Sequence, residues 1–166
     1  MEKYILIIDK NLRSISIPSE VKHIGVESDD AVNHIRFRMP QMYDGYDLST
    51  FLINVNYENA NGEGDRYIVE DAITNGGYIY FSWLVGRNAC KYKGNVKFSI
   101  CLKKMNDGVV IQEYNTMPVV LSVLEGLETT DAADEEYSDL LEQLIEKIDE
   151  ANATITVIGE TLKIGL

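Results

Sequence analysis

The sequence predicts a mainly β protein: an antiparallel, jelly-roll-like β-sandwich followed by a C-terminal amphipathic helix with coiled-coil heptads. Three observations predict this fold. Apolar and polar residues alternate repeatedly over the first 124 residues, turn-forming pairs separate the alternating segments, and the apolar spacing changes to a heptad pattern after Gly126. The predicted division is a β-sandwich docking domain over residues 1–126 and an acidic helical linker with a short tail over residues 127–166.

Period-2 alternation places every second side chain on one face of an extended strand. It is clearest over residues 34–39, 53–57, 78–85 and 96–103, and weaker segments lie at residues 4–8, 14–17, 66–70, 109–115 and 119–124. We therefore expect eight or nine short strands and no helix before Gly126. A sandwich is the expected architecture, with a closed barrel as the alternative.

Turn formers stand between these segments, where hairpins require a positive φ. They are Asn61-Gly62, Asn75-Gly76-Gly77, Asp107-Gly108 and Asp44-Gly45. We expect each of them to reverse the chain, with Pro40 ending the strand before the last of these turns.

The stretch FSWLVGRNACKYKGNVKFSI, residues 81–100, holds the single tryptophan and four cations, three of them in residues 86–94. On the alternation, Trp83 and Phe81 point inward, and Phe98 and Ile100 point inward from the next strand, so all four are expected in the core. Residues 86–94 form the connecting loop. Its cations are the candidate docking surface: Arg87, Lys91 and Lys93.

The formal charge of −12 argues against nucleic acid as a partner, since phosphate binding requires a basic surface. Residues 1–124 carry 15 acidic and 13 basic side chains, whereas residues 125–166 carry 12 acidic and 2 basic ones. No apolar run approaches the length of a membrane span or a signal sequence. Cys90 and Cys101 are too few for a disulfide framework, and we expect both to be reduced.

After Gly126, apolar residues are spaced alternately by four and three positions, as in the a/d seam of a coiled coil. The seam consists of Tyr137, Leu141, Leu144, Ile148, Ala151, Ile155 and Ile158. We expect this helix to self-associate in a parallel bundle, as a homo-oligomer and most simply a trimer, although repulsion among the acids opposes assembly. The alternative is that the helix folds back on the sandwich.

No arrangement typical of catalysis is present in the sequence, so we expect no enzymatic activity, no cofactor and no metal. His23 and His34 are expected at the surface or in loops. Calcium binding stays open at three acidic groups, which lie at residues 27–30, 44–47 and 63–65, although none matches an established calcium loop. Ten tyrosines favour protein contacts or carbohydrate stacking; the outward ones are Tyr43, Tyr46, Tyr78, Tyr80 and Tyr92.

Three stretches carry a family resemblance: HIRFRMPQMYDGYDLSTFLINVNYENANGEGDRYIV, GGYIYFSWLVGRNACKYKGNVKFSI and VIQEYNTMPVVLSVLEGLE. Together they resemble the N-terminal domain of phage baseplate upper proteins and related long tail proteins of phages and prophages of Gram-positive bacteria. The resemblance covers residues 10–128. Its matching features are Met39-Pro40, the Asp44-Gly45 turn followed by Asp47-Leu48-Ser49, residues 56–60, residues 82–85, the Tyr92-Lys93-Gly94 turn and the closing strand with Asn115-Thr116.

The resemblance implies a virion component of the tail, assembled in the cytoplasm of the bacterial host. It implies a sandwich that docks to other baseplate proteins and helices that trimerise and carry receptor-binding modules outward. The family pattern continues into a receptor-binding head, whereas this sequence stops shortly after the helix, as expected of a fragment or of an adaptor for a separate head. The alternative function is a carbohydrate-binding module for host cell-wall polysaccharide, and a hydrolase accessory has the weakest support.

Overall fold

A computed structural model describes residues 4–127 and 142–148 of the chain. The described part contains thirteen strands and one 3-10 helix. The elements are β1 (Ile5–Ile8), β2 (Ile15–Ser16), β3 (His23–Val26), β4 (Asn33–Pro40), β5 (Met42–Tyr43), β6 (Tyr46–Asp47), η1 (Leu48–Thr50), β7 (Leu52–Glu58), β8 (Gly64–Ile68), β9 (Ile73–Asn75), β10 (Tyr78–Val85), β11 (Gly94–Asn106), β12 (Val109–Asn115) and β13 (Val119–Leu124). Residues 142–148 are helical.

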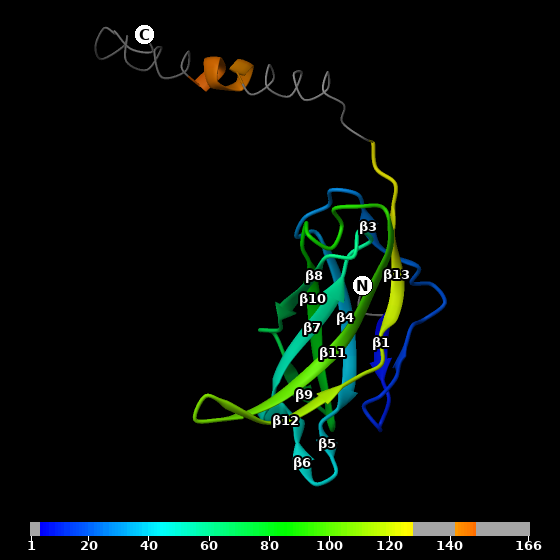
Figure 1. Cartoon of the computed structure of the whole chain (residues 1–166), viewed down its shortest axis with the longest axis vertical. Coiled ribbons are helices and arrows are strands. Elements are labelled where there is room, and N and C mark those ends of the chain that lie inside the picture. Colours follow the sequence, from blue (N-terminus) through cyan, green and yellow to red (C-terminus); the bar gives the residue numbers. More distant parts are fainter. Residues whose placement is uncertain (1–3, 128–141, 149–166) are drawn as a thin grey trace, which may run out of the picture. The chain divides into compact units, whose positions relative to one another are not determined.

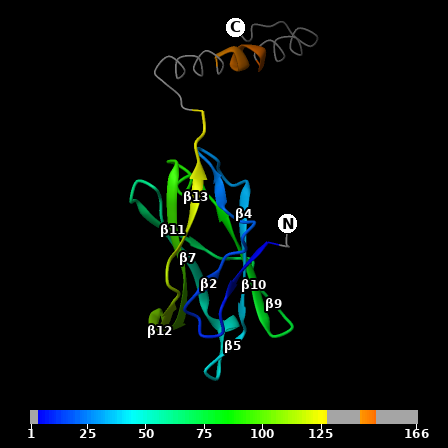
Figure 2. The ribbon, with the colours of Figure 1, turned by 90° about the vertical axis from the view of Figure 1, so that its right-hand side faces the viewer.

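Two sheets enclose a single core, so the prediction of a mainly β fold is confirmed (Figure 1). The five-stranded sheet has the order β2-β1-β4-β10-β9. The six-stranded sheet has the order β3-β13-β11-β7-β8, and β12 pairs with β11 beside this path. A separate small hairpin, β5-β6, lies at the same end of the domain as β12 in both views (Figures 1 and 2).

The prediction of purely antiparallel sheets was wrong, because both sheets are mixed. β1 runs parallel to β4, with Ile5 opposite Arg36, and β13 runs parallel to β3, with Leu124 opposite Val26. Parallel neighbours need a long crossover connection. The chain supplies one by placing β2 and β3 between β1 and β4, and β3 belongs to the other sheet. Alternation in the sequence reports which face of a strand is buried, but not the direction of its neighbour.

The predicted strands are all present, and the structure contains four further short strands that the sequence pattern did not predict. β3, β5, β6 and β9 have two to four residues each. A period of two cannot be recognised over so few positions. β9 is also exposed along its whole length, so it lacks an apolar face.

Each of the four predicted turns has residues with positive φ. Asp107 and Gly108 have φ of 53° and 78° between β11 and β12, and Asp44 and Gly45 have 52° and 82° between β5 and β6. Gly76 and Gly77 have φ of 61° and 85° between β9 and β10. Two-residue turns of this kind match the right-handed twist of the flanking strands.

Aromatic rings join the two sheets. Phe37 of β4 stacks on Phe81 of β10 with ring centroids 5.1 Å apart, and it meets Phe98 of β11 edge-on at 6.2 Å. Trp83 has no exposed surface, and its ring centroid lies 5.4 Å from that of Phe98 and 5.2 Å from that of Tyr57. Ile100 is also buried. The four residues expected in the core therefore lie in the core.

The chain divides into two compact units, Met1–Gly126 and Leu127–Leu166. In the second unit only residues 142–148 are described, and there Leu144 and Ile148 of the predicted seam are exposed. The other five seam residues lie outside the described part: Tyr137, Leu141, Ala151, Ile155 and Ile158. Among the described residues, no helix has the length and apolar character to cross a membrane.

We expect Phe37→Ala to lower the free energy of unfolding by about 3–5 kcal/mol, because it removes a fully buried ring that contacts both sheets. Urea unfolding followed by the fluorescence of Trp83 measures this loss. The matched control is Ile111→Ala, a large-to-small change at an exposed strand position, which we expect to cost about 0.5 kcal/mol or less. Equal losses in the two variants would contradict the central place given to Phe37.

Candidate docking and binding surfaces

Residues 86–94 connect β10 to β11, as expected, and their three cations are exposed, whereas Ala89 and Cys90 between them are fully buried in the core. Cys90 carries the carbonyl that accepts a hydrogen bond from Ser28 N at 2.8 Å. Burial, with a smaller effect of the Asp29 charge, raises the pKa of the Cys90 thiol to about 11. Burial also raises the pKa of Cys101. Both cysteines are free thiols, and at neutral pH they are protonated.

Two of the three predicted docking cations contact acids of their own domain. Arg87 Nη2 lies 3.9 Å from Asp30 Oδ2, and Lys93 Nζ lies 2.9 Å from Glu125 Oε1. All four side chains are about half exposed or more, so each pair contributes about 1 kcal/mol or less. Lys91 stands over the ring of Tyr92, 5.6 Å from its centroid, and makes no ion pair with any described residue.

The chain leaves β13 at the end of the domain that carries the 86–94 loop. Glu27 binds the backbone at this exit point. Its carboxylate accepts hydrogen bonds from Gly126 N at 2.9 Å and from Lys93 N at 3.2 Å. Its own backbone N–H donates to Leu124 O at 2.9 Å. A Cβ on Gly126 would lie 3.1 Å from both Cβ and O of Glu27, so a side chain here would require Glu27 to shift by a few tenths of an ångström. Glu27 therefore holds the end of β13 against the 86–94 loop.

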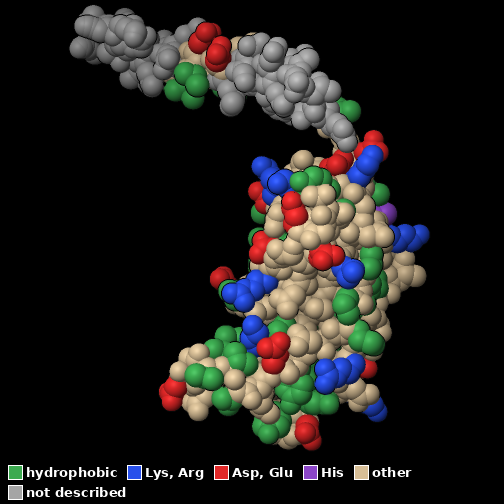
Figure 3. Space-filling view, viewed as in Figure 1, with side chains coloured by type: hydrophobic (Ala, Val, Ile, Leu, Met, Phe, Trp, Pro, Cys, Tyr) green, Lys and Arg blue, Asp and Glu red, His purple; other side chains and the backbone are tan. Residues whose placement is uncertain are grey.

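The opposite end of the domain is formed by β5, β6 and the hairpin of β11 and β12 (Figures 1 and 2), and it carries exposed apolar side chains. Beyond Lys103 the described pairings of β11 are with β12 alone, so the two strands project as an arm. Val109 and Ile111 are 61% and 54% exposed. The other large exposed residues of this end are Met42, Tyr46, Leu52, Met105 and Val110. Figure 3 shows hydrophobic side chains gathered over this end.

The arm and the small hairpin share a base of aromatic contacts. Tyr114 of β12 meets Tyr43 of β5 edge-on, with ring centroids 5.4 Å apart, and lies 5.8 Å from Phe51. Lys104 Nζ lies over the Phe51 ring and donates to Thr50 Oγ1 at 3.0 Å. The base of the arm is therefore held by the domain, whereas its tip is held only by its own hairpin. We call the exposed apolar residues of β5, β6, the start of β7 and this arm the hairpin end.

The structure brings the two histidines together, which their separation in the sequence did not indicate. His23 of β3 and His34 of β4 line the same two adjoining hollows, of about 480 and 280 Å³, between the edge of the six-stranded sheet and β4. His23 Nδ1 lies 2.8 Å from Ser122 Oγ. In the described part of the chain, no group of three or more His, Cys, Asp or Glu side chains is placed to hold a metal ion.

The acidic groups considered for calcium hold turns in this structure. Asp47 caps η1 by accepting from Ser49 N at 3.0 Å. Glu63 accepts from Asn59 Nδ2 at 2.9 Å. Hydrogen bonds from Ser49 and from Asn59, respectively, lower the pKa of these two carboxyls. Asp29 accepts from Val26 N at 3.0 Å and from Asn33 Nδ2 at 2.9 Å, beside the His23–His34 hollow.

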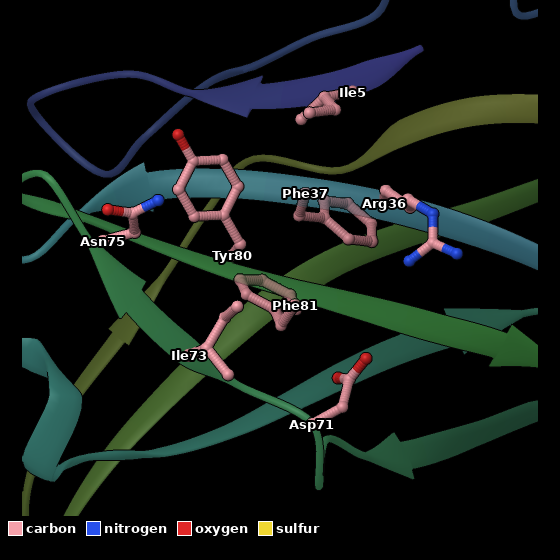
Figure 4. Close-up of a pocket in the computed structure, with 8 residues that line it drawn as sticks. All are labelled: Ile5, Arg36, Phe37, Asp71, Ile73, Asn75, Tyr80 and Phe81. Carbon is pink, nitrogen blue, oxygen red and sulfur yellow. The ribbon is translucent and has the colours of Figure 1, made fainter. Parts of the chain in front are cut away.

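A further hollow of about 290 Å³ lies on the outer face of the five-stranded sheet (Figure 4). It is lined by side chains from β1, β4, β9 and β10 and by Asp71, which precedes β9. Of the five outward tyrosines, Tyr80 lines this hollow, and Tyr78 holds the Arg38 guanidinium 4.3 Å from its ring centroid. No motif in the sequence indicated the hollow, because its residues come together only through strand pairing.

No protein-family model and no curated protein matches the sequence. Among solved structures, the N-terminal domain of ORF48 of phage TP901-1 is similar. The TM-score is 0.47 at 12% sequence identity, and the match covers 74% of this chain and 98% of that one. What the chain does must therefore be inferred from its own residues and surfaces.

We expect the Asp29 carboxylate to contribute stability that disappears in acid. The hydrogen bond from Val26 N, and after it the one from Asn33, lowers the pKa of Asp29 below its usual 3.8. A group with a lowered folded pKa stabilises fully above its unfolded pKa, and this contribution is lost as pH falls through the folded value. Asp29→Asn should cost about 1 kcal/mol at pH 7, because solvent screens the charge, and less near pH 3.

Urea midpoints at both pH values measure this difference. The control is Asp107→Asn, which removes one charge at the exposed β11–β12 turn and keeps a residue that tolerates positive φ. A cost of Asp29→Asn that stays constant with pH would show that the ionised carboxylate is not what stabilises this turn.

Proposed function

We propose that this protein is a structural component of a phage or prophage-derived tail baseplate, without enzymatic activity. In this proposal the β domain docks to a neighbouring tail protein, and the acidic C-terminal segment oligomerises and carries receptor-binding modules outward. The sequence resemblance over residues 10–128 supports it. The observation that carries it is the exposed apolar hairpin end, opposite the end where β13 leaves the domain.

An exposed apolar arm is costly for a protein that stays alone. Two-stranded hairpins are marginally stable in water, and an edge strand with adjacent Val109, Val110 and Ile111 is a site for unwanted pairing. Such an arm is stabilised when a partner covers it. Its tip carries few charges, with Asp107 at the turn, so the fitting partner presents an apolar cleft that accepts both faces of the arm.

The hairpin end is better suited to docking than the loop cations. Arg87 and Lys93 already form ion pairs with Asp30 and Glu125, and losing either cation would leave one of these acids without its ion-pair partner. Lys91 is the one of the three that is available to a partner's acid among the described residues. We therefore propose the hairpin end as the main docking surface and Lys91 as a secondary contact.

Self-association through the heptad seam completes the proposed role. A parallel trimer would bury the a/d residues, and the two described ones, Leu144 and Ile148, are exposed in the single chain. The acids of residues 125–166 repel one another in such a bundle, so salt should favour assembly. The virion is the expected location of the assembled protein.

We expect the whole chain to form a trimer, more completely as salt rises, and a chain ending at Glu128 to be a folded monomer. Light scattering after gel filtration, over a range of protein and salt concentrations, measures both masses. The matched control is Leu144→Glu with Ile148→Glu in the whole chain, which should be monomeric at all salt concentrations. A monomeric whole chain under every condition would remove the oligomerising role of the segment.

Incorporation into tails distinguishes the two docking surfaces. In particles produced with a tagged chain, we expect Val109→Glu with Ile111→Glu to abolish incorporation, because charge replaces apolar contact at exposed positions that the fold does not need. Arg87→Glu with Lys91→Glu should reduce incorporation less and leave the domain folded. The reverse order would assign docking to the loop, and normal incorporation of both variants would refute docking by either surface.

A further inference from the structure

The hollow on the outer face of the five-stranded sheet combines apolar walls with two opposite charges. Ile5 of β1 and Ile73 of β9 form apolar walls, and the partly buried ring of Tyr80 stands beside them. Arg36 of β4 and Asp71 supply the charged groups. Figure 4 shows Tyr80 toward one end of the hollow and the Arg36 and Asp71 side chains toward the other.

The carboxylate is held in place by the edge of β10. Asp71 Oδ1 accepts from Ser82 N at 3.1 Å, and Asp71 Oδ2 accepts a hydrogen bond from Ser82 Oγ. β9 pairs only with residues 78–80 of β10, so the backbone N–H of Ser82 has no partner in β9. The Asp71 carboxylate accepts from this N–H instead. Each carboxylate oxygen keeps a lone pair for another donor.

The guanidinium of Arg36 faces the same hollow without joining that arrangement. Among the described residues, Arg36 makes no ion pair, with Asp71 or with any other acid. A group that both donates and accepts hydrogen bonds can lie between the two, donating to the carboxylate and accepting from the guanidinium. A hydroxyl group does both.

From this geometry we propose that the hollow binds a neutral saccharide. One sugar hydroxyl donates to Asp71 and accepts from Arg36, while the apolar face of the sugar ring packs on Tyr80. The amide of Asn75, at the Tyr80 end of the hollow, supplies a further donor and acceptor. Small-molecule sites share this design, in which apolar walls surround a few placed polar groups.

The pairing of opposite charges selects a neutral ligand. An anionic sugar would be attracted by Arg36 and repelled by Asp71. A cationic sugar would be attracted by Asp71 and repelled by Arg36. Neither charged ligand could give both Arg36 and Asp71 a favourable charge partner, whereas a neutral hydroxyl can bind to both. A volume of about 290 Å³ is at the small end of ligand sites, which suits one or two sugar units.

The test is a titration of the whole ¹⁵N-labelled chain, observed by NMR, with maltose, N-acetylglucosamine and methyl glucoside as neutral probes at millimolar concentration. Glucuronate and glucosamine are the charged probes. We expect a neutral probe to shift the amide resonances of residues 71–75 and 80–82. Tyr80→Leu and Arg36→Gln should each weaken binding about tenfold or more.

The matched control is Tyr78→Leu, which removes a tyrosine ring from the same face of the same strand but outside the hollow. It should change affinity less than about twofold. No shift with any neutral probe, stronger binding of a charged probe, or equal losses for Tyr78→Leu and Tyr80→Leu would each overturn the proposal. If Tyr80→Leu fails to fold, Arg36→Gln decides alone. The proposal is independent of the tail role, which the incorporation experiment tests on other residues.

Discussion

The contact between the Phe37, Phe81, Trp83 and Phe98 rings is the constraint on which the rest of the structure depends. It holds the two sheets together and thereby sets which face of β4 and β10 is buried. Side chains alternate along a strand, so a slip by one residue would exchange the two faces. With Phe37 and Phe81 inward, Arg36 and Tyr80 must lie on the outer face, where the hollow forms. The packing of Phe37 and Phe81 in the core therefore determines which side chains line the hollow on the outer face.

The second organising feature is the length of β11, which connects the two ends of the domain. Its residues 94–98 pair with β13, and its residues 101–106 pair with β12. Buried Thr116 bridges the change of partner: its Oγ1 accepts from Ile100 N at 2.9 Å, and its own N donates to Ile100 O at 3.0 Å. One continuous strand therefore joins the projecting arm to the strand that leads out of the domain.

Several features were predictable because they are local in sequence. Turn pairs such as Asp107-Gly108 report their own backbone conformation, and alternation around Trp83 reports its burial. The parallel pairing of β1 with β4 was not predictable, because strand direction depends on partners that are distant in sequence. The charges of the 86–94 loop indicate its exposed side chains, but they do not indicate that Ala89 and Cys90 between them are buried. Short elements of mixed polarity give no periodic signal.

The candidate sites were harder to predict than the fold for the same physical reason. The loop cations could be identified from their residue type, but their ion pairs with Asp30 and Glu125 depend on residues 57 and 32 positions away in the chain. The hairpin end was present in the sequence as the run Val109-Val110-Ile111, which alternation alone could not distinguish from a core strand. To predict that the whole run is exposed, one must know that β12 pairs with a single described strand, β11.

The arrangement of these surfaces allows two kinds of binding in one small domain. The hairpin end belongs to the six-stranded sheet and the small β5-β6 hairpin, whereas the hollow opens on the outer face of the five-stranded sheet. A partner that covers the arm therefore need not cover Tyr80 or Asp71. Because the ring cluster packs the two sheets against each other, docking at the first surface would also orient the second. In the proposed tail role, many copies of the chain would present the proposed saccharide contact together, and this would strengthen a contact that is weak in one copy.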